Sequence, residues 1–201
     1  MSTVRADAAR NAAQIRQVAL TAFASNGLDV PLEEIAAKAG VSKATVYNRF
    51  GGRGGLIDSV VDELVATYML AVVQRADALA DPWQKLELFI TGNRDLLYQH
   101  RAAIDVILNR YPESERIAEL CDACADACRR IVAQGRAAGV LREDFHVNDL
   151  YDAFVTTALA LKHGPRPARA DFRRRTRFFI DGIRAAARAD DKPSEGRSGS
   201  F

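Results

Sequence analysis

Six side chains that can bind a polyanion lie within eleven residues of one another. They are Lys43, Thr45, Tyr47, Asn48, Arg49 and Arg53. Hydroxyl and guanidinium groups bind phosphate oxygens, whereas Asn can pair with adenine and Lys with guanine at the edges of bases. The segment therefore has the chemistry of a surface that contacts nucleic acid.

The same segment also carries apolar residues that a folded domain would bury. Val41, Val46 and Phe50 bracket the polar residues. The pattern predicts a short helix over 43–49, capped by Ser42 and preceded by a turn at Gly40. With a helix expected over 31–39, this is a helix-turn-helix pattern, whose second helix enters the major groove. The alternative is a helical hairpin with a polar outer face that binds no DNA.

Charge is distributed unevenly along the 201 residues. Residues 1–55 carry seven Lys/Arg against four Asp/Glu, whereas residues 56–170 carry thirteen against seventeen. A basic N-terminal part on a mildly acidic body suits a protein that binds a polyanion at one end. No run approaches the roughly 18 apolar residues of a membrane span, and the N-terminus lacks the apolar core of a secretory signal. We expect a cytoplasmic protein with no membrane partner.

The apolar spacing predicts an all-α protein with about nine helices. Apolar residues recur every three or four positions, and the alternating pattern of strands is missing. Gly27 is expected to end the first helix, and Asp81 and Pro82 to begin another. Besides the two helices of the helix-turn-helix, the expected elements include helices over 56–79, 102–110 and 114–138 and helices that begin near 148 and 171. We expect a DNA-binding domain at 1–55, a ligand-binding and dimerisation domain at 56–188, and a disordered tail at 189–201.

Three cysteines share one face of the helix predicted over 114–138. Cys121, Cys124 and Cys128 are spaced i, i+3, i+7. Three thiolates at this spacing could bind a soft metal, or two of them could be oxidised. A purely structural interpretation is that the cysteines continue an apolar core stripe, because Cys is a small hydrophobic residue. A further interpretation is that they line a ligand pocket. We predict no metal site and no cofactor, and keep a thiol- or metal-responsive regulator as the alternative.

A family resemblance rests on the segment LEEIAAKAGVSKATVYNRFGGRGGL, residues 32–56. It resembles the DNA-binding signature of the tetracycline-repressor (TetR) family of bacterial regulators. The resemblance covers residues 10 to about 60 and includes the end of the first helix, AFASNGLDV. The matching positions are Ile35-Ala36, Ala39-Gly40-Val41-Ser42, Thr45, Tyr47, Phe50, Arg53 and Leu56.

The resemblance implies a homodimeric repressor that a small hydrophobic effector releases from a palindromic DNA operator; activation stays open. By position, base contacts fall on Lys43, Ala44 and Asn48, and phosphate contacts on Thr45, Tyr47 and Arg53. Arg49 stands where the family often has His. The segment Gly51–Gly55 departs from the family, and each Gly costs up to about 1 kcal/mol relative to Ala in a helix. The start of the next helix is therefore expected to be frayed, which puts the Arg53 contact in doubt.

Helical spacing and the resemblance together nominate a pocket and a dimer surface. The pocket residues are Tyr68, Phe89, Asn93, Leu97, Cys121, Cys124 and Phe154. The dimer surface, on the last two helices, comprises Phe154, Val155, Phe172, Phe179 and Ile183. The alternative for both sets is that they form the core of one monomer.

The competing class is an all-helical enzyme. The sequence has no nucleophile elbow, phosphate loop or His-Glu-x-x-His motif. We therefore expect a regulator and no enzymatic turnover.

Overall fold

The computed structural model describes residues 2–108 and 110–185, and the predicted tail at 189–201 lies outside them. The described residues form ten α-helices, one π-helical turn and an isolated bridge between Leu141 and Arg184. The elements are α1 (Ser2–Asn26), α2 (Leu32–Lys38), α3 (Lys43–Phe50), α4 (Arg53–Asp58), η1 (Asp62–Ala66), α5 (Thr67–Asp77), α6 (Pro82–Gln99), α7 (Arg101–Ile107), α8 (Glu115–Ala137), α9 (Val147–His163) and α10 (Arg169–Ile183).

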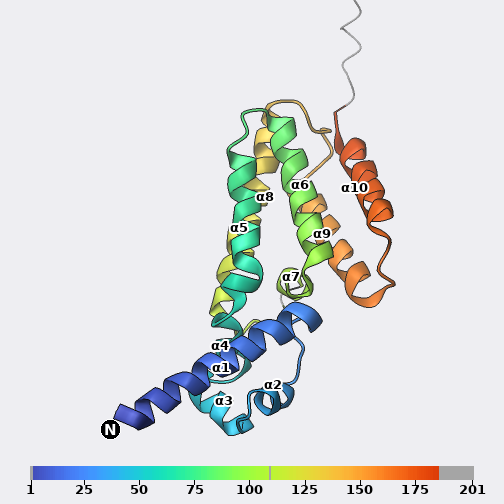
Figure 1. Cartoon of the computed structure of the whole chain (residues 1–201). Helices are drawn as coiled ribbons and strands as arrows, with labels where there is room; N and C mark the ends of the chain where they lie inside the picture. The colour runs from blue at the N-terminus through green and yellow to red at the C-terminus, as the bar shows by residue number, and fades with distance from the viewer. Residues whose placement is uncertain (1, 109, 186–201) are drawn as a thin grey trace, which may run out of the picture.

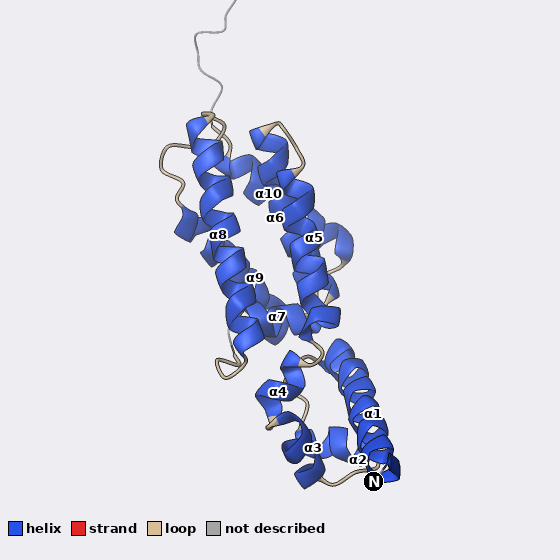
Figure 2. Cartoon of the chain, turned by 90° about the vertical axis from the view of Figure 1, so that its left-hand side faces the viewer, coloured by secondary structure: helices blue, strands red, loops and turns tan. Residues whose placement is uncertain are grey.

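The helices form two groups that are stacked end to end. Figure 1 shows α1–α4 gathered below and α5, α6, α8, α9 and α10 rising above them. In the second view the long helices run side by side along the upper part (Figure 2). The short helix α7 lies at the lower end of this bundle and packs on α1. The all-α prediction is confirmed.

Helix ends follow the caps that the sequence predicts. The Ser42 hydroxyl accepts a hydrogen bond from the Thr45 amide, and Asp81 caps α6 through the amide of Gln84 at 2.7 Å. Gly27, with φ 83°, follows α1 in the left-handed region as predicted. Pro31 precedes α2 instead of lying inside its first turn, and its carbonyl accepts the first helical bond from Ile35.

The helix predicted over 56–79 is interrupted, which corrects the sequence prediction. α4 ends at Asp58, and the chain turns before η1 and α5 continue. The Ser59 carbonyl, which an unbroken helix would pair with the amide of Glu63, accepts a 2.7 Å hydrogen bond from Arg16 Nε on α1. The Glu63 amide instead donates to Val60. A tertiary contact therefore replaces a helical one at the break.

Two apolar clusters form the interior. One joins the N-terminal helices to the lower end of the bundle and includes Phe23, Ile57 and Ile104. The other fills the upper bundle and includes Phe89 and Phe154. Because the first cluster is shared, α1–α4 rest on a continuous apolar contact with the helices above them.

A buried charge fixes the loop between α1 and α2 to the bundle. Asp105 on α7 is only 2% exposed. Its carboxylate accepts a 2.7 Å hydrogen bond from the Leu28 amide and forms an ion pair with Lys162 on α9. Lys162 also contacts Asp29 at 2.7 Å, and Tyr111 donates to Asp29. Burial raises the pKa of Asp29, but Lys162 and Tyr111 outweigh it and hold that pKa below its usual range. We call Leu28, Asp29, Asp105, Tyr111 and Lys162 the loop clasp.

Candidate nucleic-acid interface

The turn between α2 and α3 is tight and fixes how α3 is presented. Gly40 adopts φ 66°, and the Val41 amide donates to the Ala36 carbonyl at 3.0 Å. Val46 of α3 and Ile35 of α2 are both fully buried. One side of α3 is thereby held in the core, so its opposite side faces solvent.

The predicted contact residues of α3 lie on that solvent side. Tyr47 is 48% exposed. Thr45 is half-buried, and its hydroxyl lies 2.9 Å from Ser42 Oγ. The exposed positions among the predicted DNA contacts are Lys43, Ala44, Tyr47, Asn48 and Arg49.

Glu33 of α2 is paired with Lys43, one of the residues predicted to contact bases. Lys43 forms an ion pair with Glu33, and its ammonium lies 5.6 Å from the centre of the Tyr47 ring. The side-chain hydrogen bond to Glu33 raises the pKa of Lys43, and the same bond lowers the pKa of Glu33. A DNA contact by Lys43, as predicted from the sequence, would require its ammonium to leave this carboxylate.

Glu33→Gln is therefore expected to tighten DNA binding. The change frees Lys43 and removes a negative charge beside the phosphates, so affinity should rise several-fold, chiefly through a faster association rate at low salt. The measurement is fluorescence anisotropy with a labelled duplex at two salt concentrations. Glu119→Gln on α8, which also removes an exposed acid, serves as the matched control. Unchanged or weaker binding by Glu33→Gln would contradict the placement of Lys43 at the interface.

The glycine-rich segment after α3 is ordered by close packing, contrary to the frayed start that the sequence suggested. Gly52 adopts φ 110°, and a Cβ there would lie 3.2 Å from the Tyr47 ring. α4 begins at Arg53, whose guanidinium donates to the Leu28 carbonyl at 2.7 Å and lies 5.9 Å from the Tyr111 ring. The half-buried Arg53 is thus engaged by the loop clasp through one guanidinium nitrogen, and we leave it out of the phosphate contacts proposed below.

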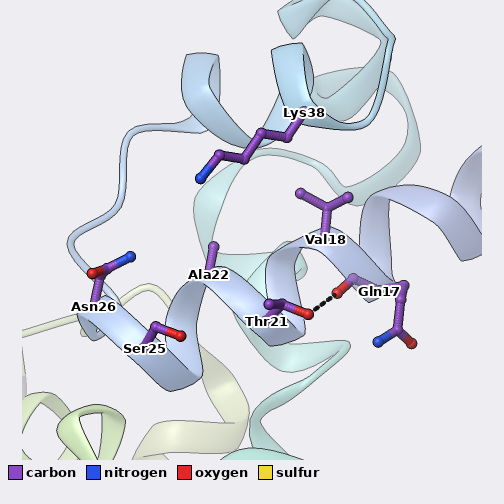
Figure 3. Close-up of a pocket in the computed structure, with 7 residues that line it drawn as sticks. All are labelled: Gln17, Val18, Thr21, Ala22, Ser25, Asn26 and Lys38. Atoms are coloured by element: carbon purple, nitrogen blue, oxygen red, sulfur yellow. Dashed lines mark hydrogen bonds between the residues drawn. The ribbon is translucent and has the colours of Figure 1, made fainter.

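A hollow of about 270 Å³ lies between α1 and α2. Figure 3 shows its lining residues, with Lys38 reaching across from α2 above Ala22 and Asn26 of α1. The Lys38 ammonium is already paired with Glu34 at 2.7 Å, and Thr21 donates to the Gln17 carbonyl of its own helix. Since these polar groups are used within their own helices, we assign the hollow no ligand.

A small cavity in the bundle contains four of the seven predicted pocket residues. Its lining residues are Met69, Asn93, Leu96, Leu97, Ala103, Ile107, Cys124 and Phe154. Its volume, about 20 Å³, has room for about one water molecule. Tyr68 does not belong to it: the side chain is 47% exposed and its ring stacks on His100. Phe89 and Cys121 also lie outside its lining.

Asn93 is the polar group of this cavity. It is 7% exposed, and its amide nitrogen donates to the Phe89 carbonyl at 2.9 Å. Within the described residues its amide oxygen accepts no hydrogen bond. A ligand with a hydroxyl or amide donor would find its acceptor here.

The pKa values of the three thiols on α8 are shifted in different directions, and a hydrogen bond with Cys128 lowers the pKa of Cys124. Burial raises the pKa of Cys121 to about 11. A hydrogen bond with Cys124, together with burial, raises the pKa of Cys128 far above its usual range. In the described part of the chain, no group of three or more His, Cys, Asp or Glu is arranged to hold a metal ion. The geometry thus offers no metal-holding group in the described residues, and the contact between Cys124 and Cys128 does not by itself indicate a thiol-responsive regulator.

Three of the five residues predicted for the dimer surface are core residues of the monomer. Phe154, Phe172 and Ile183 are each at most 5% exposed, because α9 and α10 turn them toward α6 and α8. Val155 and Phe179 are half-buried. The large hydrophobic side chains that face solvent on these two helices are Tyr151 and Leu159, each 44% exposed, and Phe178, 64% exposed. Amphipathic spacing alone could not separate the two sides.

These features define a class of protein. A capped α2–turn–α3 unit with a polar, exposed second helix is the helix-turn-helix of DNA-binding proteins. In the described residues no helix is both long and apolar enough to cross a membrane.

Comparisons with known proteins agree with this class. Residues 15–60 match the family model described as bacterial regulatory proteins, tetR family. No match was found among curated proteins. Residues 15–60 carry the DNA-binding segment of the TetR family, and the protein is a DNA-binding transcriptional regulator.

Solved structures share the fold over most of the chain. The ketosteroid transcriptional regulator KstR2 of Mycobacterium tuberculosis is 19% identical, with a TM-score of 0.64 over 88% of this chain and 96% of that one. A putative fatty acid metabolism regulator of Clostridium perfringens is 20% identical, with a TM-score of 0.60 over 85% and 98%. The regulator PfmR of Thermus thermophilus is 18% identical, with a TM-score of 0.61 over 83% and 94%. At these identities the likeness is one of fold.

Proposed function

We propose that this regulator is a repressor that binds a palindromic operator as a homodimer and leaves it when a small hydrophobic effector binds. Residues 1–55 would bind DNA, and residues 56–188 would bind the effector and form the dimer. The observation that supports this most is the exposed polar side of α3, held rigidly over a buried Val46. Base contacts are proposed for Lys43, Ala44 and Asn48, and phosphate contacts for Thr45, Tyr47 and Arg49.

Genomic DNA selection with the purified protein, followed by footprinting, tests the DNA-binding proposal. We expect a palindromic site whose half-sites lie one helical turn apart, roughly 34–36 Å. Tyr47→Ala should weaken binding to this site at least about tenfold, because it removes both a phosphate donor and the ring on Gly52. Tyr68→Ala, equally exposed but on α5, is the control. Only weak, salt-sensitive and sequence-independent binding would contradict a specific operator.

We propose that α9 and α10 form the dimer seam through Leu159 and Phe178 rather than through the buried residues predicted from the sequence. Exposed apolar side chains of this size on two adjacent helices lose contact with water when a second copy covers them. A twofold axis through such a seam matches a palindromic site.

Phe178→Glu is expected to convert the dimer to a monomer at micromolar concentration. The substitution places a charge in the seam without touching the monomer core, so the helical content should not change. Sedimentation velocity measures the association state. Leu70→Glu, on the exposed side of α5 across the bundle from α10, is the control and should leave it unchanged (Figure 1). A Phe178→Glu protein that still sediments as a dimer would place the seam elsewhere.

The effector site that we propose is the cavity beside Asn93. Because its volume is about 20 Å³, an effector must select a state in which the cavity is larger. Ala103 and Ile107 line it from α7, and Asp105 on the same helix holds the Leu28 amide. An effector that displaces α7 would therefore act on the loop that precedes α2 and α3.

We infer that the protein acts by binding rather than by catalysis and works in the cytoplasm, where chromosomal DNA is accessible to it. The family's members are regulators, which supports the first point. The experiment is a comparison of any identified effector before and after incubation with the protein. Recovery of a chemically altered compound would contradict it.

A further inference from the structure

Arg94 is a largely enclosed charge for which the described residues supply no counter-ion. It projects from α6 between α9 and α10. Its Nε donates to Thr176 at 2.9 Å, and its terminal nitrogen donates to Thr157 at 2.7 Å. The guanidinium lies over the ring of Phe172, 5.2 Å from its centre. Among the described residues, no carboxylate forms an ion pair with Arg94.

The two threonines orient this guanidinium without neutralising it. Each hydroxyl proton is used within its own helix: Thr157 donates to Ala153 at 2.6 Å, and Thr176 donates to Phe172 at 3.0 Å. The oxygens are therefore left as fixed acceptors for Arg94. Burial lowers the pKa of Arg94, the direction expected for a positive charge removed from water without an anion. Such a charge gains much from a carboxylate partner.

A pocket of about 290 Å³ opens beside Arg94. Its lining includes Arg94, Thr156, Thr157, Leu161, Phe172 and Arg175. Two guanidinium groups and two hydroxyls thus share the pocket with an apolar wall. The neighbouring acids are already engaged, since Asp95 pairs with Arg169 at 3.2 Å and Asp171 with Arg174 at 3.0 Å.

We propose that this pocket binds a small organic carboxylate. The carboxylate oxygens would accept hydrogen bonds from Arg94 and Arg175, and the apolar part of the ligand would lie against Phe172 and Leu161. The pocket is distinct from the cavity at Asn93, which Arg94 does not line. Because it opens between α9 and α10, a bound carboxylate would lie beside the proposed dimer seam and could tune it.

The test is a calorimetric titration of the full chain with benzoate, using benzamide as a neutral probe of nearly equal shape. Benzoate should bind at least about tenfold more tightly than benzamide, because only the anion pairs with the guanidinium groups. Arg94→Met should abolish that preference, and Arg94→Lys should retain part of it. Arg130→Met, on the exposed side of α8, should have no effect. A thermal melt of each variant tests whether it folds. If Arg94→Met does not fold, Arg175→Met replaces it as the test: Arg175 is exposed, so this variant should fold and should bind benzoate more weakly.

Two outcomes would overturn the proposal. One is equal binding of benzoate and benzamide, or no saturable binding of either up to about 10 mM. The other is that benzoate does not bind while Arg94→Met weakens self-association in sedimentation. In that case an acidic side chain of a second copy supplies the carboxylate, and the site is part of the dimer seam.

Discussion

Asp105→Ala should lower the free energy of unfolding by about 3 kcal/mol, because it leaves the charge of Lys162 and the amide of Leu28 inside the protein without their partner. This loss of stability is at the low end of the range for breaking a buried ion pair, because Lys162 keeps its 2.7 Å contact with Asp29. Urea denaturation measures the change. Hydrogen exchange should show the Leu28 amide losing protection before the rest of the chain.

A double-mutant cycle isolates the pair from the loss of packing. Asp105→Ala combined with Lys162→Met should recover a substantial part of the loss, since no uncompensated charge then stays buried. Asp77→Ala is the matched control: its partner Arg130 is 41% exposed, so the cost should be below about 1 kcal/mol. An Asp105→Ala protein as stable as the Asp77→Ala protein would show that the loop clasp contributes little.

Gly55→Ala is expected to cost about 3 kcal/mol and to abolish specific DNA binding. A Cβ at this position would lie 1.8 Å from the Phe50 carbonyl oxygen, which is backbone and cannot rotate away. The end of α3 must therefore move relative to α4, and overpacking against backbone falls at the upper end of its usual range. Urea denaturation and operator binding by anisotropy measure both effects.

Gly182→Ala is the control for the intrinsic difference in helix propensity between glycine and alanine. It lies in α10, where a Cβ meets nothing within 4 Å, so the change should be neutral or slightly stabilising. If Gly55→Ala behaved like Gly182→Ala, the contact between α3 and α4 would be looser than the structure shows. The departure from the family pattern at 51–55 would then have no steric role.

Local features of the fold were predictable because they depend on neighbouring residues. The caps at Ser42 and Asp81 each bond an amide three residues ahead, and the left-handed turn at Gly27 depends on the absence of a Cβ. The exposed polar side of α3 followed from the apolar spacing that buries Val46. Each of these signals acts over less than two helical turns.

Predictions that required a long-range partner were less successful. The helix over 56–79 breaks because Arg16, 43 residues away, binds the Ser59 carbonyl. Arg53 donates a hydrogen bond to the Leu28 carbonyl, 25 residues away, which its place in the sequence does not indicate. An apolar stripe likewise does not indicate whether it faces its own bundle or a second copy, and so the spacing predicts Phe154 and Phe172 at a dimer surface although both lie in the monomer core.

The sequence by itself determined that the protein is helical, where most helices begin, and which side of α3 is polar, since periodicity and capping are properties of adjacent residues. Only the tertiary structure decided which charges are buried. Asp105 and Arg94 are ordinary charged residues in the sequence. Distant helices bury Asp105 and partly cover Arg94, so that the first joins the loop clasp and the second lacks a carboxylate partner among the described residues.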